Sequence, residues 1–405
     1  MIQPVTLSSR ITWRLTIALA VVLGAMGFGA CSSDAAASTT SRPIAAAPSL
    51  PTPMATSIET GDGTWVTFPM GRLDEALNTF WQLFFEPTAG GTWSNRVEAT
   101  ATATNGGLVL APTDVGGLVV GVRPSSYLTY TPLVSALGPA TSWSNGLIDA
   151  ALAARPDALA SGPGGDGLAL IGHGSQSRVV ASSGSLSIWR SLVDERALAT
   201  TGPGRACGLA FITAVGYLGT RAMIGASCRH ADTVGLYVQR GGEWQLANVR
   251  LPHALSHGRV EVLALQYEGS SATALLAVAQ KTTTSLVAAW SVSAGHWTTS
   301  SALRVSAGAS VASFGPVGGS GLFALVQSAG SRDTLAVTNQ SDPTWRDLPS
   351  PPVGTATIAF ASPSSAAAFV ATTVVVTIWS LNPATNRWVA GHVVDVPIQF
   401  GSSSQ

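Results

Sequence analysis

Tryptophan recurs along this chain at nearly regular intervals. Seven of its twelve tryptophans lie 43 to 55 residues apart, at Trp93, Trp143, Trp189, Trp244, Trp297, Trp345 and Trp388. A fixed period of this size indicates an architecture built from repeated structural units.

The segments between these tryptophans favour short strands. Runs of Val, Leu, Ala and Thr are cut by Gly, Pro and Ser, as in Thr357–Ala361 and Ala366–Ala371. Each of the last three intervals offers four strands, with the marker tryptophan in the outermost. Trp189 is the exception, because it aligns with Trp290 and Trp379, one strand earlier. The sequence therefore predicts an all-β fold, a seven-bladed β-propeller over residues 57–405.

A propeller must close its ring, because open strand edges are prone to aggregation. The first unit offers three strands, at 64–68, 79–85 and 92–97. We expect Val394–Phe400 to supply the missing strand and to join the two ends of the domain. The spacing of apolar residues in Leu73–Phe84 also permits a short helix.

The N-terminus has the pattern of an export signal. Arg10 and Arg14 precede the apolar run Leu15–Phe28, which is shorter than the roughly 20 residues that span a bilayer. Gly29, Ala30 and Cys31 follow, and this arrangement resembles the lipobox of bacterial lipoproteins. The resemblance implies a signal peptide over residues 1–30 and a lipid-modified Cys31 as the mature N-terminus. The alternative is an ordinary signal peptide in which Cys31 has no role.

The segment that follows is typical of a tether. Residues 31–56 are mostly Ala, Ser, Thr and Pro, with Asp34 and Arg42 as the only charges. Such a composition buries too little apolar surface to fold. We therefore expect a protein that is exported and lipid-anchored to the outer face of the bacterial cell membrane.

Composition excludes some classes of partner. Charged residues make up 10% of the chain and the formal net charge is zero. Nucleic-acid binding needs a basic surface, so we expect no nucleic-acid partner.

Two cysteines remain besides Cys31. Cys207 and Cys228 flank two apolar runs around a turn at Gly216–Gly219. Folding the chain about that turn places them opposite each other, and an exported protein meets oxidising conditions. We expect a disulfide, with two buried free thiols as the alternative.

Several turns resemble those of known propeller repeats. Residues 62–65, 90–93 and 341–345 are similar to degenerate Asp-boxes of sialidase-type propellers, and 382–388 is similar to a kelch turn. These resemblances imply architecture and no activity. A sialidase would also need an arginine cluster, and the sequence does not group three arginines.

Other motifs give no site. Residues 162–167 match G-x-G-x-x-G, but they precede a strand, so we interpret them as a turn. His253 and His257 lack the glutamate of H-E-x-x-H and are interpreted as loop residues, as is His173. No G-x-S-x-G motif is present. We therefore predict no catalytic, cofactor-binding or metal site.

These observations favour a non-catalytic binding or scaffold lipoprotein whose partner is an envelope protein or a glycan. The alternative is a propeller that binds or hydrolyses glycans, in the manner of a sialidase. The sequence favours the absence of enzymatic activity and does not identify the partner.

Overall fold

The computed structural model describes residues 55–396 apart from internal gaps. The gaps are 72–78, 89–90, 96–107, 114–117, 123–132, 138–155, 173, 185, 187, 269–270, 294, 307, 329–331 and 373. All described residues belong to one compact unit, Ile44–Gln405. Within the described ranges, no helix has both the length and the apolar character needed to cross a membrane.

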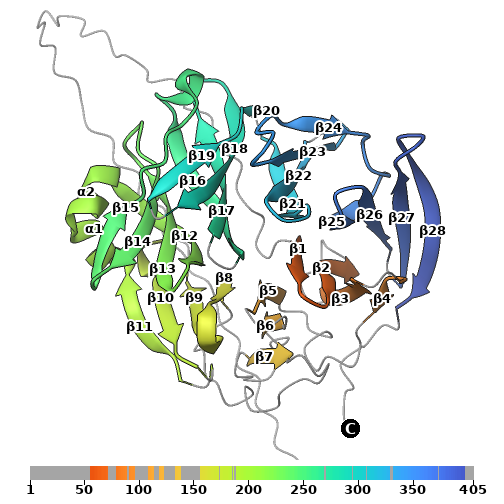
Figure 1. Ribbon diagram of the computed structural model, residues 1–405, viewed down its shortest axis with the longest axis horizontal. Helices are drawn as coiled ribbons and strands as arrows, with labels where there is room; N and C mark the ends of the chain where they lie inside the picture. Colours follow the sequence, from red (N-terminus) through yellow and green to blue (C-terminus); the bar gives the residue numbers. More distant parts are fainter. Residues whose placement is uncertain are drawn as a thin grey trace, which may run out of the picture. The chain divides into compact units, whose positions relative to one another are not determined.

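The described strands fall into seven consecutive groups, which we call blades 1 to 7 (Figure 1). Blade 1 contains β1 (Ala55–Thr60), β2 (Gly63–Gly71), β3 (Thr79–Pro87) and β4 (Ser94–Asn95). Blade 2 contains β5 (Leu108–Pro112), β6 (Leu118–Val122) and β7 (Leu133–Leu137). Blade 3 contains β8 (Ala158–Ser161), β9 (Gly167–Ile171), β10 (Arg178–Ser182) and β11 (Arg190–Asp194). Blade 4 contains β12 (Leu209–Leu218), β13 (Arg221–Cys228), β14 (Leu236–Arg240) and β15 (Glu243–Leu246). Blade 5 contains β16 (Arg259–Glu268), β17 (Ser271–Ala279), β18 (Thr284–Ser293) and β19 (His296–Thr299), and the short strand β20 (Leu303–Val305) also pairs with β18. Blade 6 contains β21 (Ser310–Pro316), β22 (Gly321–Gln327), β23 (Thr334–Asn339) and β24 (Arg346–Leu348). Blade 7 contains β25 (Thr355–Ser362), β26 (Ser365–Ala371), β27 (Val375–Asn382) and β28 (Arg387–Asp395).

Helices are few and short in the described residues. The α-helices α1 (Glu195–Thr200) and α2 (Gly202–Cys207) connect blade 3 to blade 4. Asp194 and Thr201 cap them, each accepting a hydrogen bond from a backbone N–H of the first turn. Three 3-10 turns lie at Pro163–Gly165, Gly174–Gln176 and His253–Leu255.

Apolar clusters between neighbouring blades hold the ring together. Separate clusters join blades 2 and 3, 3 and 4, 4 and 5, 5 and 6, and 6 and 7. Another joins blade 7 to blade 1, where Phe369 of β26 contacts Phe68, Phe84 and Trp93. β5 of blade 2 lies against β1 and β2 of blade 1, which completes the ring. The chain therefore forms a closed seven-bladed β-propeller, which confirms the predicted fold class.

The innermost strands define two faces of this ring. β1 pairs in parallel with β21, and β13 pairs antiparallel with both β12 and β16, so β12 and β16 are parallel. The turns between first and second strands, and those between third and fourth strands, thus lie on one side, which we call the 1–2 face. The turns between second and third strands, and the linkers between blades, lie on the opposite 2–3 face.

The marker tryptophans occupy one position of the blade. Trp244, Trp297 and Trp388 lie in the fourth strand of their blades, while Trp93, Trp189 and Trp345 directly precede it. The expectation that Trp189 belongs to the third strand was therefore wrong. Its indole Nε1 donates to the Leu186 carbonyl at 2.7 Å, within the turn that leads into β11. Trp143 lies outside the described residues.

Blade 1 differs from the prediction at its inner edge. Its four strands all come from the N-terminal part, because β1 supplies the innermost one. Val394 belongs to β28 and pairs with Val376, so the expectation that it starts a strand of blade 1 was wrong. The rest of that expected strand, 397–400, lies outside the described residues. The sequence hid β1 because Ile58 is its only large apolar residue, whereas small side chains such as Ser57 are fully buried between inner strands. β3 is a strand from Thr79, against the helical alternative.

Candidate functional site

The most chemically varied cluster lies on the 1–2 face, where the inner strands of blades 4 and 5 end. Tyr217 of β12 and Tyr267 of β16 meet edge to face, with ring centroids 6.3 Å apart and an interplanar angle of 68°. They come from consecutive blades and are related by one repeat. We call Tyr217, Tyr267 and Asp166 the tyrosine cluster.

Blade 3 closes one side of this cluster. A Cβ built on Gly162 would lie 2.8 Å from three atoms of the Tyr217 ring, so only glycine permits the ring to pack on this turn. Asp166, in the same turn, accepts a hydrogen bond from the Gly184 N–H at 3.2 Å. The G-x-G-x-x-G segment is thus a turn between two antiparallel strands, as predicted.

The electrostatics of the cluster favour binding over nucleophilic chemistry. Burial, and secondarily the Asp166 carboxylate, raise the pKa of the Tyr217 phenol far above its ordinary value. The phenol therefore stays protonated at physiological pH. Aromatic rings with a few convergent polar groups are typical of ligand sites.

A second polar row lies at the same face on blade 1. Glu59, Thr64 and Glu86 are directly paired across β1, β2 and β3. Burial raises the pKa of both glutamates, and for Glu59 a hydrogen bond from the Gly318 N–H at 2.9 Å opposes that rise. Because Gly318 belongs to the β21–β22 turn, Glu59 connects blade 1 to blade 6, which is a structural role.

Glu261 lies near the 2–3 face on the inner strand β16, between Ser227 and Ala277. Burial raises the pKa of its carboxyl to about 7.

We expect Glu261 to make stability depend on pH. Its pKa is 4.5 when unperturbed and about 7 in the fold, so the stabilisation is complete below pH 4.5 and is lost as the pH rises through about 7. The loss is about 3 to 4 kcal/mol, since each unit between 4.5 and about 7 corresponds to about 1.4 kcal/mol. Urea unfolding at pH 4.5, 6 and 8 should show it in the wild type and not in Glu261→Gln. The exposed Glu243→Gln is the control, and an unchanged pH profile in Glu261→Gln would contradict the assignment.

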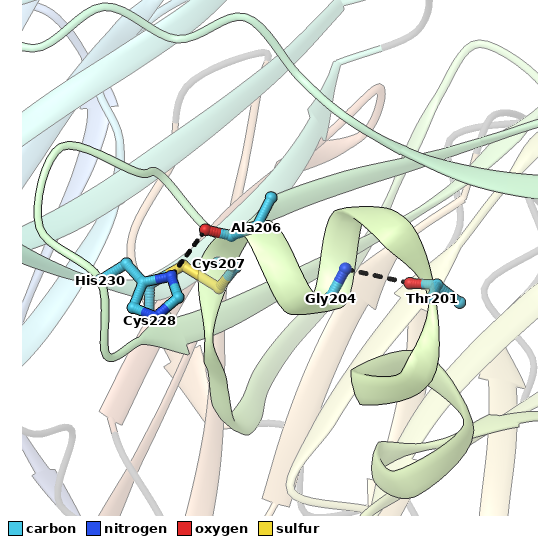
Figure 2. The surroundings of a disulfide bond; sticks show 6 residues. All are labelled: Thr201, Gly204, Ala206, Cys207, Cys228 and His230. Carbon is cyan, nitrogen blue, oxygen red and sulfur yellow. Dashed lines mark hydrogen bonds between the residues drawn. A yellow bond between two sulfur atoms is a disulfide. The ribbon is translucent and has the colours of Figure 1, made fainter.

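The structure also places the residues singled out in the sequence. Cys207 and Cys228 form a disulfide with Cα atoms 5.0 Å apart, as predicted (Figure 2). Cys207 ends α2 and does not lie on a strand, so the bond ties the helical connection to the end of β13. His230 lies beside it, with Nδ1 3.0 Å from the Ala206 carbonyl oxygen. Cys31 and His173 lie outside the described residues.

The remaining candidates stay apart. His253 lies in a 3-10 turn, and His257 Nδ1 is 3.5 Å from Asp232 Oδ1 at an exposed position. No group of three metal-binding side chains occurs in the described residues. The described arginines are all at least partly exposed, so none forms a buried cluster.

The turn motifs occupy two different places in the blades. Residues 90–93, 341–345 and 382–388 lead from a third into a fourth strand, whereas 62–65 lies at the turn between β1 and β2. Side-chain oxygens of Asn339 and Asn382 accept backbone hydrogen bonds that shape two of these turns. These contacts give the motifs a structural function in the turns.

Comparison with known proteins supports the fold. The chain matches no protein-family model and no curated protein. Among solved structures it is similar to the periplasmic gluconolactonase of Pseudomonas aeruginosa, at 13% identity and a TM-score of 0.50 over 82% of this chain and 95% of that one. It also matches a putative 6-phosphogluconolactonase from Bacteroides uniformis, at 14% identity and a TM-score of 0.48 over 83% of this chain and 98% of that one. At such identities the likeness concerns the fold alone.

Proposed function

We propose that this protein is a non-catalytic binding or scaffold protein of the bacterial cell envelope, anchored through a lipid on Cys31, that holds a protein or glycan partner on its 1–2 face. The tyrosine cluster is the observation that carries this proposal. Its two rings lie on the rigid inner strands of blades 4 and 5, and its carboxylate lies in the β8–β9 turn of blade 3. Rigid elements hold such groups more precisely than loops do.

The disulfide supports a place in the envelope, because buried disulfides are typical of exported proteins.

Co-purification from detergent-solubilised envelope, with a C-terminal tag, tests the proposal. We expect a partner, detected by mass spectrometry for protein and by sugar analysis for glycan, at constant ratio with the wild type. Tyr267→Ala should reduce its recovery at least tenfold. Phe211→Ala is the matched control, because Phe211 is a partly exposed aromatic residue of an inner strand near the 2–3 face.

Cys31→Ala separates anchoring from binding. This variant should leave the membrane fraction in 500 mM salt, whereas the wild type stays, and mass spectrometry of the wild type should find acyl chains on Cys31. Equal recovery of the partner with Tyr267→Ala and wild type would contradict the binding site. An unmodified N-terminus other than Cys31 would contradict the anchor.

A further inference from the structure

The 2–3 face of blades 4, 5 and 6 carries a concentration of exposed basic side chains. Six lie at strand ends, turns and linkers of this face: Arg229, Arg250, Arg259, Lys281, Arg304 and Arg332. The acids of the same region are Asp232, which lies beside His257, the exposed Asp347, and the half-buried Asp333 and Glu261. The whole chain has zero net charge, so this local excess is a property of the tertiary structure.

These basic groups are not neutralised within the described residues. None of the six forms a salt bridge there, and Arg229 acts on Glu195 only as a nearby charge. Arg229 and Arg259 flank the bridge between β13 and β16, so they lie close together. Unpaired cations at this density attract an anionic surface.

Exposed apolar side chains lie on the same face at blade 7. Val353 of the linker before β25 is 98% exposed, and Val374 and Val393, at the β26–β27 turn and near the end of β28, are 40% and 58% exposed. Basic groups beside exposed apolar groups are the combination that binds the interface of an anionic bilayer.

The direction of β1 gives an independent argument. β1 begins at Ala55 on the 2–3 face and runs towards the 1–2 face. The chain that leads from Cys31 therefore joins the domain on the 2–3 face.

We propose that the 2–3 face docks on the membrane surface, with the basic side chains of blades 4 to 6 against anionic lipid headgroups. The domain then lies flat on the bilayer, and the 1–2 face points away from it. This goes beyond the proposed function, because it assigns a second surface with a different partner.

Vesicle co-sedimentation tests the docking without the lipid anchor. The probe is the full chain with Cys31→Ala, and the vesicles are phosphatidylcholine with or without 30% phosphatidylglycerol. Pure phosphatidylcholine vesicles report any binding through the apolar N-terminal segment. We expect phosphatidylglycerol to strengthen binding more than 100-fold in 50 mM salt, and the gain to disappear in 500 mM salt.

Matched triple variants identify the face. Each basic residue near an anionic surface contributes about fivefold to affinity, so Arg250→Gln/Arg259→Gln/Arg304→Gln should bind about 100-fold more weakly. Arg190→Gln/Arg240→Gln/Arg387→Gln removes the same charge from exposed arginines at the turns before fourth strands, on the 1–2 face, and should bind within threefold of the parent. Equal losses in both variants, or no effect of phosphatidylglycerol, would overturn the proposal. Neither result would affect partner binding at Tyr267.

Discussion

Replacing Phe369 with alanine should lower the free energy of unfolding by about 3 to 5 kcal/mol, the cost of removing a fully buried phenylalanine from a close-packed core. Phe369 has no exposed surface. Its ring lies 4.9 Å from Trp93, 5.4 Å from Phe68 and 5.7 Å from Phe84, measured between ring centroids. All three partners belong to blade 1, so the loss falls on the junction between the last blade and the first. Urea unfolding followed by tryptophan fluorescence measures it.

Two controls make this test specific for ring closure. Val389→Ala removes a half-exposed side chain from the same blade and should change stability by less than about 0.5 kcal/mol. Combining Phe369→Ala with Trp93→Ala should reveal a coupling of about 0.5 to 1.5 kcal/mol, because the two rings meet edge to face at 89°. Additive effects would mean that this aromatic contact does not hold the blades together.

Loss of the disulfide is the second large effect. The bond closes a separation of 21 residues, for which loop entropy predicts a stabilisation of about 3 kcal/mol. The free energy of unfolding of Cys207→Ser/Cys228→Ser should therefore be lower by about 3 kcal/mol, which moves the unfolding midpoint to a lower urea concentration. Replacing both cysteines avoids leaving one buried thiol, since Cys207 and Cys228 are 0% and 3% exposed.

Reductant provides the matching control. Dithiothreitol should lower the stability of the unfolded-and-refolded wild type to that of the double variant, and should leave the variant unchanged. A double variant that unfolds within about 1 kcal/mol of the oxidised wild type would show that α1, α2 and β13 hold this corner without the bond.

Periodic features of the chain were predictable because each blade repeats the same local pattern. The tryptophan spacing predicted seven units, since a large aromatic residue recurs at the start of the fourth strand. The pairing of Cys207 with Cys228 followed from the hairpin between them, although the helical position of Cys207 did not. Trp189 was assigned to the third strand of its blade, although it directly precedes the fourth. The turns differ in length between blades, so counting residues along the sequence can place a residue one strand too early.

The sequence by itself determined the class of fold, the number of blades and the disulfide, because strand alternation, turn residues and hairpin pairing are local. The tertiary structure alone decided which distant residues meet. Tyr217, Tyr267 and Asp166 come together only once blades 3, 4 and 5 pack, and β1 becomes a strand only against β21 and β2. The separation of charge onto one face has the same origin, because a position in the chain acquires a face only when the strands are arranged around the ring.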